Sequence, residues 1–376
     1  MDDKKTDKSK SRSLSFRERQ RAALHENLTV IKSHIVDATE ASKEVDICSA
    51  FDKSKLSGNY VTLDWQHRED INRIHTSIRA YARDNTRNRP LNIIMQAEPG
   101  SGKSHFVKSL ATALAESVFM PRKPATVDFN MASLQSIDDL IQPLDAVRNL
   151  KVIDKLPILF LDEFDSNPAR YPLLLPLLWD GELHIGHRDL RLGKVVIVLA
   201  GSGSSIDATM KAAKSMQSTT PSEPPKLADL LSRINGGEID IPPLDLVSGD
   251  RDRRVDKVCL TISLLQSRFG VLETIPWSLL HFVAITRFRY GVRSIAHLID
   301  LITPPDFDEE TPSRKLDKKQ LRLPFSSADQ LKAHSLAYHL LTEDGPASII
   351  ESWKAAQESD GDVRVTQPPS EDEAGF

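Results

Sequence analysis

Cysteine is scarce in this sequence, and long apolar runs are missing. Its two cysteines, Cys48 and Cys259, are too few for a disulfide framework or a zinc site. We therefore expect a reducing, cytoplasmic compartment. No apolar run approaches the roughly 18 residues that a membrane-spanning helix needs. The sequence thus predicts no membrane partner, and the charged residues 1–13 lack the apolar segment of a secretory signal.

A strong excess of charge of one sign is missing as well. The 376 residues carry a formal net charge of −4, with 40 % hydrophobic and 27 % charged side chains. This composition is typical of a soluble globular protein and argues against a dedicated nucleic-acid binder. Residues 1–23 hold eight Lys or Arg against four Asp or Glu. A nucleic-acid or acidic partner therefore stays open, beside the alternative of a solvated tail.

Short apolar runs with helical patterns between them fill the middle of the chain. The runs that we interpret as strands are residues 91–95, 125–129, 157–162 and 194–200. This alternation predicts an α/β fold with a parallel sheet covered by helices. After about residue 252 the strand signals fade, and the spacing of apolar residues becomes helical. The helices expected there are residues 255–268, 277–287, 291–302 and 327–341. Near the start of the chain, residues 50–65 look irregular.

The first strand runs into AEPGSGKSHF (97–106), a segment typical of a phosphate-binding loop. Glycines let the backbone curl around a ligand, Lys103 can reach the β- and γ-phosphates, and Ser104 can place its hydroxyl on Mg²⁺. Ala97 stands where the pattern G-x-x-x-x-G-K-[ST] has its first glycine. A glycine-rich turn without a ligand is the alternative. The residues expected to hold the nucleotide are Glu98, Pro99, Gly100, Ser101, Gly102, Lys103, Ser104 and His105.

The third strand ends in two acidic residues, in the segment LPILFLDEFDS. A nucleotide needs a cation to offset its charge and a base to orient water. Asp162 suits the magnesium shell and Glu163 suits the base. Without a phosphate-binding loop ahead of them, these residues would equally fit the start of a surface loop. Asp165 suits either chemistry or a helix cap.

PGSGKS followed by ILFLDEFDS resembles the AAA+ branch of the P-loop ATPases. The resemblance spans about residues 65–304. It implies a five-stranded parallel α/β core, with residues 238–241 as the fifth strand, followed by a C-terminal helical lid. ATP and Mg²⁺ are the cofactors that it implies, with hydrolysis of ATP to ADP and phosphate. It also implies self-association into a ring, commonly a hexamer in this family.

Three later segments resemble further parts of the same family. KVVIVLAGSGSS (194–205) resembles the sensor 1 strand, with Ser202 as first choice and Ser204 as second for the polar residue beside the γ-phosphate. DLLSR, ending at Arg233, resembles the arginine-finger segment, which reaches a neighbouring subunit's nucleotide. YGVRSIAHLIDLI, with Arg293, resembles the sensor 2 helix. The alternative for the first segment is a turn of small residues after a strand. The alternative for Arg233 and Arg293 is that they are ordinary surface arginines.

Two further segments have weaker signals. Residues 181–193 alternate polar and apolar side chains around glycines, which fits a short hairpin. His184 and His187 in it lack a third ligand nearby, so we expect no metal there. Asn130, at the end of the second strand, either bonds Glu163 in the manner of the family's glutamate switch or forms a turn.

These signals divide the chain into segments. They are a disordered tail (1–15), an N-terminal helical extension (16–64), the AAA+ core (65–247), a helical lid (248–304), a C-terminal helical extension (305–356) and an acidic disordered tail (357–376). We expect ATP turnover to remodel an unidentified protein or protein–nucleic-acid client. A nucleotide-gated switch with slow hydrolysis is the alternative, because residues 131–140 lack the aromatic residue and glycine of a threading pore loop.

Overall fold

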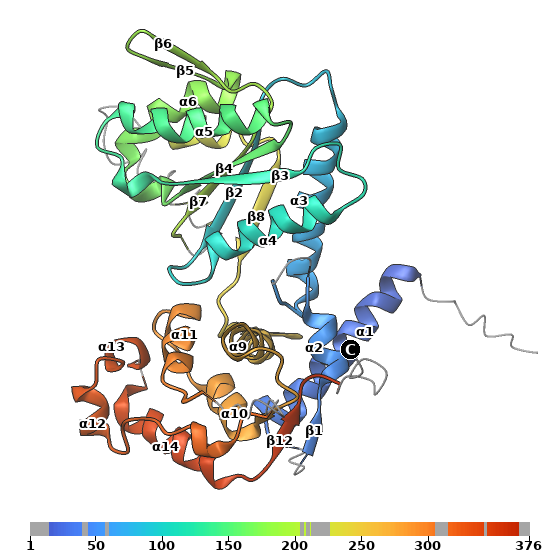
Figure 1. Ribbon diagram of the computed structural model, residues 1–376, viewed down its shortest axis with the longest axis vertical. Coiled ribbons are helices and arrows are strands. Elements are labelled where there is room, and N and C mark those ends of the chain that lie inside the picture. The colour runs from blue at the N-terminus through green and yellow to red at the C-terminus, as the bar shows by residue number, and fades with distance from the viewer. Residues whose placement is uncertain are drawn as a thin grey trace, which may run out of the picture.

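The computed structural model describes residues 15–39, 44–56, 60–203, 207, 211, 226–304, 315–341 and 344–367. Ser204 and most of both expected tails lie outside these ranges. The described chain forms a sheet-containing lobe and a helical lobe, joined where the chain leaves the sheet for the helices (Figure 1). None of the described helices is long and apolar enough to cross a membrane.

A five-stranded, entirely parallel sheet organises the first lobe, in the order β3-β4-β7-β2-β8. Its strands are β2 (Leu91–Ala97), β3 (Pro124–Asn130), β4 (Leu156–Asp162), β7 (Val196–Gly201) and β8 (Gly237–Ile241). The predicted fold class is confirmed, including the last strand at 238–241. Three of the five strands, β2, β4 and β7, are buried along almost their whole length. Helices cover both faces of the sheet there, which explains why these strands are apolar without polar alternation.

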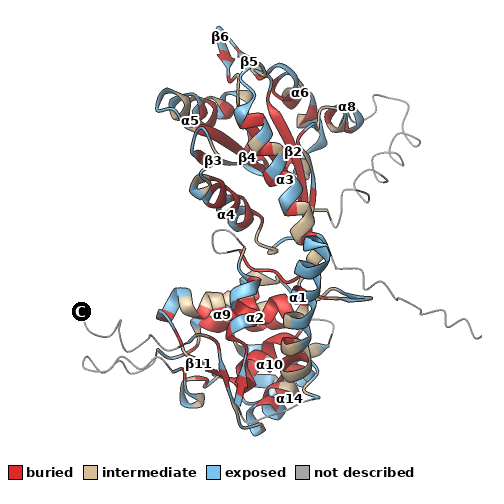
Figure 2. Cartoon of the chain, turned by 90° about the vertical axis from the view of Figure 1, so that its right-hand side faces the viewer, coloured by how far each residue is buried: buried red, intermediate tan, exposed pale blue. Residues whose placement is uncertain are grey.

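The side chains of β2 point alternately to two separate cores. Ile93 and Met95 pack with helices α3 (Trp65–Arg83) and α4 (Lys103–Glu116), whereas Ile94 packs with α5 (Ile141–Val152) and α6 (Tyr171–Asp180) on the other face. Short α8 (Leu227–Leu231) lies beside α6. Figure 2 shows the strands as buried layers between partly exposed helices.

The hairpin expected at 181–193 is present and projects from the top of this lobe (Figure 1). It pairs β5 (Glu182–Ile185) with β6 (Arg188–Arg191). Gly181 ends α6 in the left-handed conformation, at φ +68°, which lets the chain turn directly into β5. His184 Nδ1 lies 2.5 Å from Asp189 Oδ1 across the exposed hairpin.

The helical lobe gathers segments from both ends of the chain around one core. Its helices are α1 (Phe16–Ile31), α2 (Cys48–Ser54), α9 (Arg254–Phe269), α10 (Trp277–Ile285), α11 (Val292–Asp300), α12 (Ala328–Ala333), α13 (Ala337–Leu340) and α14 (Gly345–Glu358). The rings of Phe282 and Trp353, for example, meet edge to face at 4.9 Å. The extensions and the lid, separate segments in the sequence, are therefore one packed unit.

Three sequence expectations for this lobe were wrong. Residues 50–65 look irregular in sequence, but α2 covers the first part of them. The helix expected from Ser327 to Leu341 breaks at His334, whose extended backbone separates α12 from α13. The tail expected to be disordered from 357 contains strand β12 (Asp362–Arg364). Acidic residues suggested disorder, but Val363 is fully buried between two neighbouring strands.

Strand β12 lies in the middle of a small sheet in the order β1-β12-β11, with β1 (Glu44–Asp46) and β11 (Thr274–Pro276). It pairs in parallel with β1 and antiparallel with β11, so a strand from each end of the chain lies side by side (Figure 1). The remaining short elements are a π-helical turn (Lys32–Val36), 3₁₀ turns (Met131–Ser133, Ile137–Leu140, Phe164–Ser166, Pro168–Arg170, Lys318–Gln320) and the strand pair β9 (Val247–Ser248) and β10 (Arg251–Asp252).

Candidate functional site

The segment after β2 forms a tight loop that ends where α4 begins at Lys103. Gly100 and Gly102 adopt φ of +83° and +89°, a conformation that glycine reaches without strain. Ser101 N donates to Glu98 O across 3.1 Å and closes the turn. The expected nucleotide-binding residues 98–105 thus lie together in this loop and the first turn of α4. The free N–H groups of a helix start favour an anion here.

Lys103 lies at the centre of the site, only 9 % exposed. Its Nζ donates to the carbonyl oxygens of Ala97 at 3.3 Å and Gly201 at 3.2 Å, at the ends of β2 and β7. It also lies 3.9 Å from Asp162 Oδ1, at the end of β4. The ammonium group is therefore held between three strand ends. Ser104 and His105, by contrast, are exposed on α4.

The two carboxylates differ in environment. Burial raises the pKa of Asp162 above its ordinary value, an effect opposed by the nearby charges of Lys103 and Arg293. Glu163 has φ +53°, uncommon for a residue with a side chain, and its N–H donates to Asp162 Oδ1 across 3.0 Å. Backbone held in such a conformation is concentrated at functional sites.

Two hydrogen bonds fix the loop after β7. Ser202 N donates to the Asp165 carboxylate across 2.9 Å, so Asp165 tethers this loop to the segment that follows β4. Gly203 N donates to Gln96 Oε1 across 3.2 Å, which tethers the same loop to β2. Sequence reasoning left Asp165 open and missed Gln96, whose only signal in the sequence is a polar residue directly after an apolar run.

Asn130 forms a turn in this structure. Its Oδ1 accepts a hydrogen bond from Ala132 N across 2.7 Å and caps the short 3₁₀ turn after β3. Of the two roles that the sequence left open for Asn130, the structure displays the turn-forming one. Asn130 nevertheless lies level with Asp162 on the neighbouring strand.

The helical lobe contributes α11 to this site. Val292 N donates to Gly100 O across 3.1 Å, so the start of α11 is hydrogen-bonded directly to the loop after β2. A Cβ on Gly100 would overlap the main-chain oxygen of Tyr290, which shows how closely the two backbones approach. Arg293 is exposed on the first turn of α11, and its charge lowers the pKa of Asp162.

Arg233 lies at the opposite edge of the sheet. Its carbonyl oxygen accepts a hydrogen bond from Asn92 Nδ2 across 2.9 Å, and Asn92 is the second residue of β2. Because the strands are parallel, this is the edge where they begin, whereas Lys103 lies where they end. Arg233 is therefore not brought to Lys103 within one chain.

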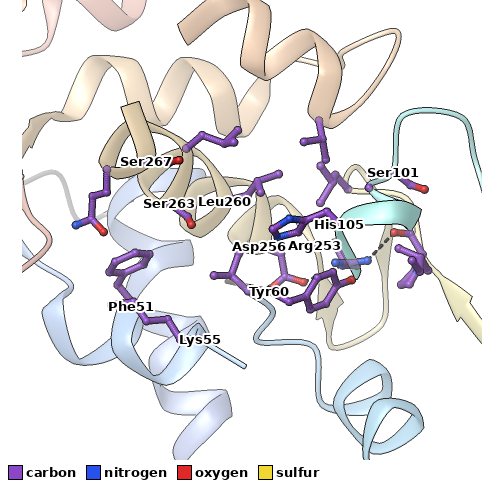
Figure 3. Close-up of a pocket in the computed structure, with 18 residues that line it drawn as sticks. Phe51, Lys55, Tyr60, Ser101, His105, Arg253, Asp256, Leu260, Ser263 and Ser267 are labelled. Carbon is purple, nitrogen blue, oxygen red and sulfur yellow. Dashed lines mark hydrogen bonds and ion pairs between the residues drawn. The ribbon is translucent and has the colours of Figure 1, made fainter. Parts of the chain in front are cut away.

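A cavity of about 680 Å³ opens beside the loop, between α2, α9 and the end of β8 (Figure 3). Tyr60, His105, Ile241 and Leu260 are among its lining residues, with Ser101 and Gly102 of the loop at one end. Its size and mainly apolar walls suit a small organic ligand. Sequence analysis missed the contributions of α2 and α9, because only the packing of the two lobes creates this cavity.

Buried charges brace the floor of the cavity. Asp256, 2 % exposed, accepts hydrogen bonds from Thr62 Oγ1 at 2.8 Å and Arg253 Nε at 2.8 Å. Tyr60 and His67 share a hydrogen bond of 2.8 Å nearby. Burial raises the pKa of Tyr60 to about 12 and lowers the pKa of His67 well below its ordinary value. Both groups are therefore neutral at physiological pH.

Ser104, on the first turn of α4, and Asp162, at the end of β4, carry side-chain oxygens that could bind a metal ion. A serine hydroxyl and one carboxylate fit Mg²⁺, which keeps several waters and takes its other ligands from substrate phosphates. Within the described parts of the chain, no group of three or more His, Cys, Asp or Glu side chains forms a metal site made by protein alone.

Comparison with known proteins gives one family match. Residues 93–216 match the model of the ATPase family associated with various cellular activities (AAA). A search of curated proteins gave no match.

Solved structures give low-identity likenesses. NtrX from Brucella abortus in complex with ADP is 14 % identical with a TM-score of 0.43, over 81 % of this chain and 60 % of that one. NtrX in complex with ATP is 15 % identical with a TM-score of 0.38, over 76 % and 67 %. The S. cerevisiae Hsp104–ADP complex is 14 % identical with a TM-score of 0.36, over 69 % and 42 %. This chain thus spans less than two thirds of the length of the NtrX–ADP chain.

Proposed function

We propose that this chain, whose residues 93–216 match the AAA family of ATPases, binds ATP with Mg²⁺ and hydrolyses it. One observation supports the proposal above others. Side chains far apart in sequence, Lys103, Asp162 and Arg293, converge at one edge of the sheet, with Lys103 Nζ 3.9 Å from Asp162 Oδ1. Ligands of open parallel sheets bind at this carboxyl edge.

Binding uses the loop and the adjoining cavity. The phosphates of ATP are held by the N–H groups of residues 100–104 and by the ammonium group of Lys103, which exchanges its carbonyl partners for phosphate oxygens. The nucleoside occupies the cavity beside Tyr60 and Leu260. When bound, Mg²⁺ offsets phosphate charge. Ser104 and Asp162 are the residues of this chain that would hold it.

Hydrolysis then requires one oriented water molecule. The water oxygen attacks the γ-phosphorus, and its proton passes to the carboxylate of Glu163. The bond between the γ-phosphorus and the β–γ bridging oxygen breaks, and its electron pair stays on ADP. Inorganic phosphate is the second product, and the proton leaves Glu163 for solvent. Ser202 and Arg293 stabilise the charge on the γ-phosphate, while Asp165 holds the Ser202 loop in place.

Self-association completes the site. Arg233 lies at the amino edge of the sheet, away from Lys103 of its own chain, so it acts on the nucleotide of a second copy. The resulting oligomer, a ring by family resemblance, couples turnover to remodelling of a protein or protein–nucleic-acid client.

A nucleotide-gated switch with slow hydrolysis is the second candidate, and the segment after β3 favours it. Met131, Leu134 and Leu140 point into the core there. Arg170 donates hydrogen bonds to the carbonyl oxygens of Met131 and Leu134 and fastens the segment down. Among these described residues no exposed aromatic side chain is available to grip a threaded chain.

Substitutions at two positions test the chemistry. Lys103→Ala should abolish both ATP binding and turnover, whereas Glu163→Gln should keep binding and lose turnover. Exposed Lys108 on the same helix and Glu182 in the hairpin give the matched controls Lys108→Ala and Glu182→Gln. If the unmodified protein takes up no ATP with magnesium, or if Lys103→Ala turns over ATP normally, the proposal is wrong.

Mixing experiments test the shared site. Arg233→Ala and Lys103→Ala should each be inactive alone, but mixed oligomers should regain turnover. In the mixture, intact Arg233 on one chain meets an intact nucleotide site on the other. Fast basal turnover without any client would exclude the switch, while turnover that rises only when a client is added would support it.

A further inference from the structure

Trp179 is a large apolar side chain that is left 48 % exposed, at the end of α6. Two guanidinium groups lie near its ring. The Cζ of Arg89 is 4.5 Å from the ring centroid and that of Arg233 is 5.9 Å from it. Both distances are within cation–π range. The exposed indole of Trp179 therefore contacts two cations. Their like charges repel each other, so the surrounding fold must hold them close together.

The three residues come from three separate segments. Arg89 precedes β2, Trp179 lies in the last turn of α6, and Arg233 follows α8. Helices α6 and α8 lie side by side in the sheet-containing lobe (Figure 2). The cluster is thus a product of the fold, and no short sequence motif encodes it.

A buried framework fixes these segments to one another. Asn92, fully buried in β2, donates from its side chain to Leu178 O at 2.7 Å and to Arg233 O at 2.9 Å. Asn235 donates to Pro90 O at 3.2 Å and accepts a hydrogen bond from Asn92 N at 2.8 Å. Three of these four bonds act on the main chain at or beside a member of the cluster. A buried amide in an apolar strand is destabilising unless it forms hydrogen bonds. The hydrogen bonds of Asn92 hold together the segments that carry Trp179 and Arg233.

The positive charge of the cluster is not neutralised within the described chain. Neither Arg89 nor Arg233 forms an ion pair with a carboxylate there. Arg233 Nη1 donates to the main-chain oxygen of Asp229, and Arg233 Nε is buried without a partner among the described residues. Asp180 and Asp229 lie beside the cluster in sequence, but the structure records no ion pair between either of them and the two arginines.

We propose that Arg89 and Arg233 together form a two-arginine site for the phosphate chain of a nucleotide bound to a second copy of this protein. Arg89 is then a second cation acting in trans, and Trp179 is the positioning residue that holds both guanidinium planes. This inference rests on the proposed function. Two preorganised guanidinium groups suit a polyphosphate, because each offers paired N–H donors to phosphate oxygens and neither forms an ion pair with a carboxylate of the described chain.

The first experiment measures steady-state ATP turnover and nucleotide binding of full-length variants. We expect Arg89→Ala to lower kcat about tenfold or more with KM nearly unchanged, because the lost charge acts on the transition state. Trp179→Leu should have a similar effect, and Trp179→Phe should restore most of the activity. The control is Arg87→Ala, since Arg87 stacks on Tyr81 at 5.3 Å, away from the cluster. An Arg89→Ala variant with unchanged kcat would overturn the inference.

The second experiment mixes chains. Lys103→Ala has a dead nucleotide site but an intact Arg89, so adding it to Arg89→Ala should recover turnover. If the mixture stays as slow as Arg89→Ala alone, Arg89 does not act in trans and the inference fails. If Arg233→Ala is slow while Arg89→Ala is normal, the inference fails but the proposed function stands. Failure of the unmodified protein to hydrolyse ATP defeats both.

A third measurement tests the competing ligand of the two-arginine site, which is the phosphate backbone of a nucleic acid. Fluorescent single-stranded and double-stranded oligonucleotides are titrated into the unmodified protein and Arg89→Ala. Equal, weak binding by both, together with the loss of kcat, supports the nucleotide of a second copy. Oligonucleotide binding that falls in Arg89→Ala while ATP turnover stays normal overturns the proposal in favour of nucleic acid.

Discussion

The main-chain N–H of Ser202 donates to the carboxylate of Asp165 across 2.9 Å, and so joins the loop after β7 to the segment after β4. The Ser202 hydroxyl lies 3.4 Å from the same carboxylate. The sequence allowed Asp165 either a chemical role or a helix cap. In the structure, Asp165 helps to position Ser202 relative to Asp162 and Glu163.

Removing this carboxylate tests that relationship. We expect Asp165→Ala to lower kcat for ATP about tenfold while ATP still binds, since a hydrogen bond to a charged group is worth about 1.5–3 kcal/mol. Asp165→Asn keeps one acceptor oxygen and should lose less. Steady-state kinetics and equilibrium nucleotide binding measure the two effects. Unchanged kcat in Asp165→Ala would show that the tether is irrelevant to turnover.

The close approach of Gly100 to Tyr290 predicts intolerance of even a methyl group. Gly100→Ala should push α11 away from the loop and lower ATP affinity by at least about tenfold, because a Cβ would overlap Tyr290 O. Gly186→Ala is the matched control. Gly186 also has positive φ, at +57°, but nothing lies within 4 Å of its added Cβ. The control should cost only backbone strain of about 1 kcal/mol in stability, with ATP affinity unchanged. Equal affinity losses in both variants would contradict this prediction.

Asp162 is expected to destabilise the chain when no magnesium is bound. Its folded-state pKa is raised by burial, so the folded state binds this proton more tightly than the unfolded state does. Stability is therefore lost as pH rises through the folded-state pKa, and the cost is fully present at neutral pH. Asp162→Asn should match or exceed the unmodified protein in Tm at pH 7, and this difference should shrink near pH 4.

The same variant should lose magnesium-dependent ATP turnover. The control is Asp128→Asn. Asp128 lies on β3, next to β4, and forms an exposed ion pair with Lys108 of α4. Its loss should change neither Tm nor ATP turnover appreciably. A clear drop in Tm for Asp162→Asn at pH 7 would mean that attraction to Lys103 outweighs the burial of the carboxylate.

His75 makes the protein sensitive to acid. Burial lowers the pKa of His75 to about 4, whereas the unfolded chain takes up this proton near pH 6.5. The contribution of neutral His75 to the free energy of unfolding is fully present above pH 6.5 and is lost as the pH falls toward 4. At pH 5 the loss is about 2 kcal/mol. Urea unfolding at pH 7.5 and 5 should show a smaller acid loss in His75→Gln. Exposed His184 provides the control variant His184→Gln, which should behave like the unmodified protein.

The acidic C-terminal segment is predicted to be structurally essential up to residue 367. A chain ending at residue 360 loses β12, and with it the fully buried Val363 and Val365. Burying each valine contributes about 1.5–3 kcal/mol, so the helical lobe should become protease-sensitive and melt at a lower temperature. A chain ending at 367 keeps the strand and should melt like the full-length protein. Equal melting of the two truncated chains would contradict the prediction.

The parts of the fold that could be predicted from sequence are those with a local signature. The strand at 157–162 is apolar on both faces, which only a covered parallel sheet explains, and the segment after residue 97 combines glycines with a lysine at a helix start. In each case the neighbouring residues alone carry the information, so no knowledge of distant contacts is needed.

The features that sequence reasoning missed depend on distant partners. Val363 sits in an acidic segment and becomes a core residue only because β1 and β11 lie on either side of it. Gln96 and Asn92 are polar residues in an apolar strand, and their roles emerge only when the Gly203 and Arg233 segments are in place. The cavity near Tyr60 likewise needs both lobes. Periodicity cannot report contacts made across more than 100 residues of chain.

The bond from Val292 N to Gly100 O has a mechanical consequence. Gly100 belongs to the loop that we propose binds phosphate, and Val292 begins a helix of the lobe that contains both described ends of the chain. That lobe cannot tilt without either stretching this bond or reshaping the grip. A force applied where β1 and β12 pair would thus change how firmly the proposed nucleotide site holds its ligand.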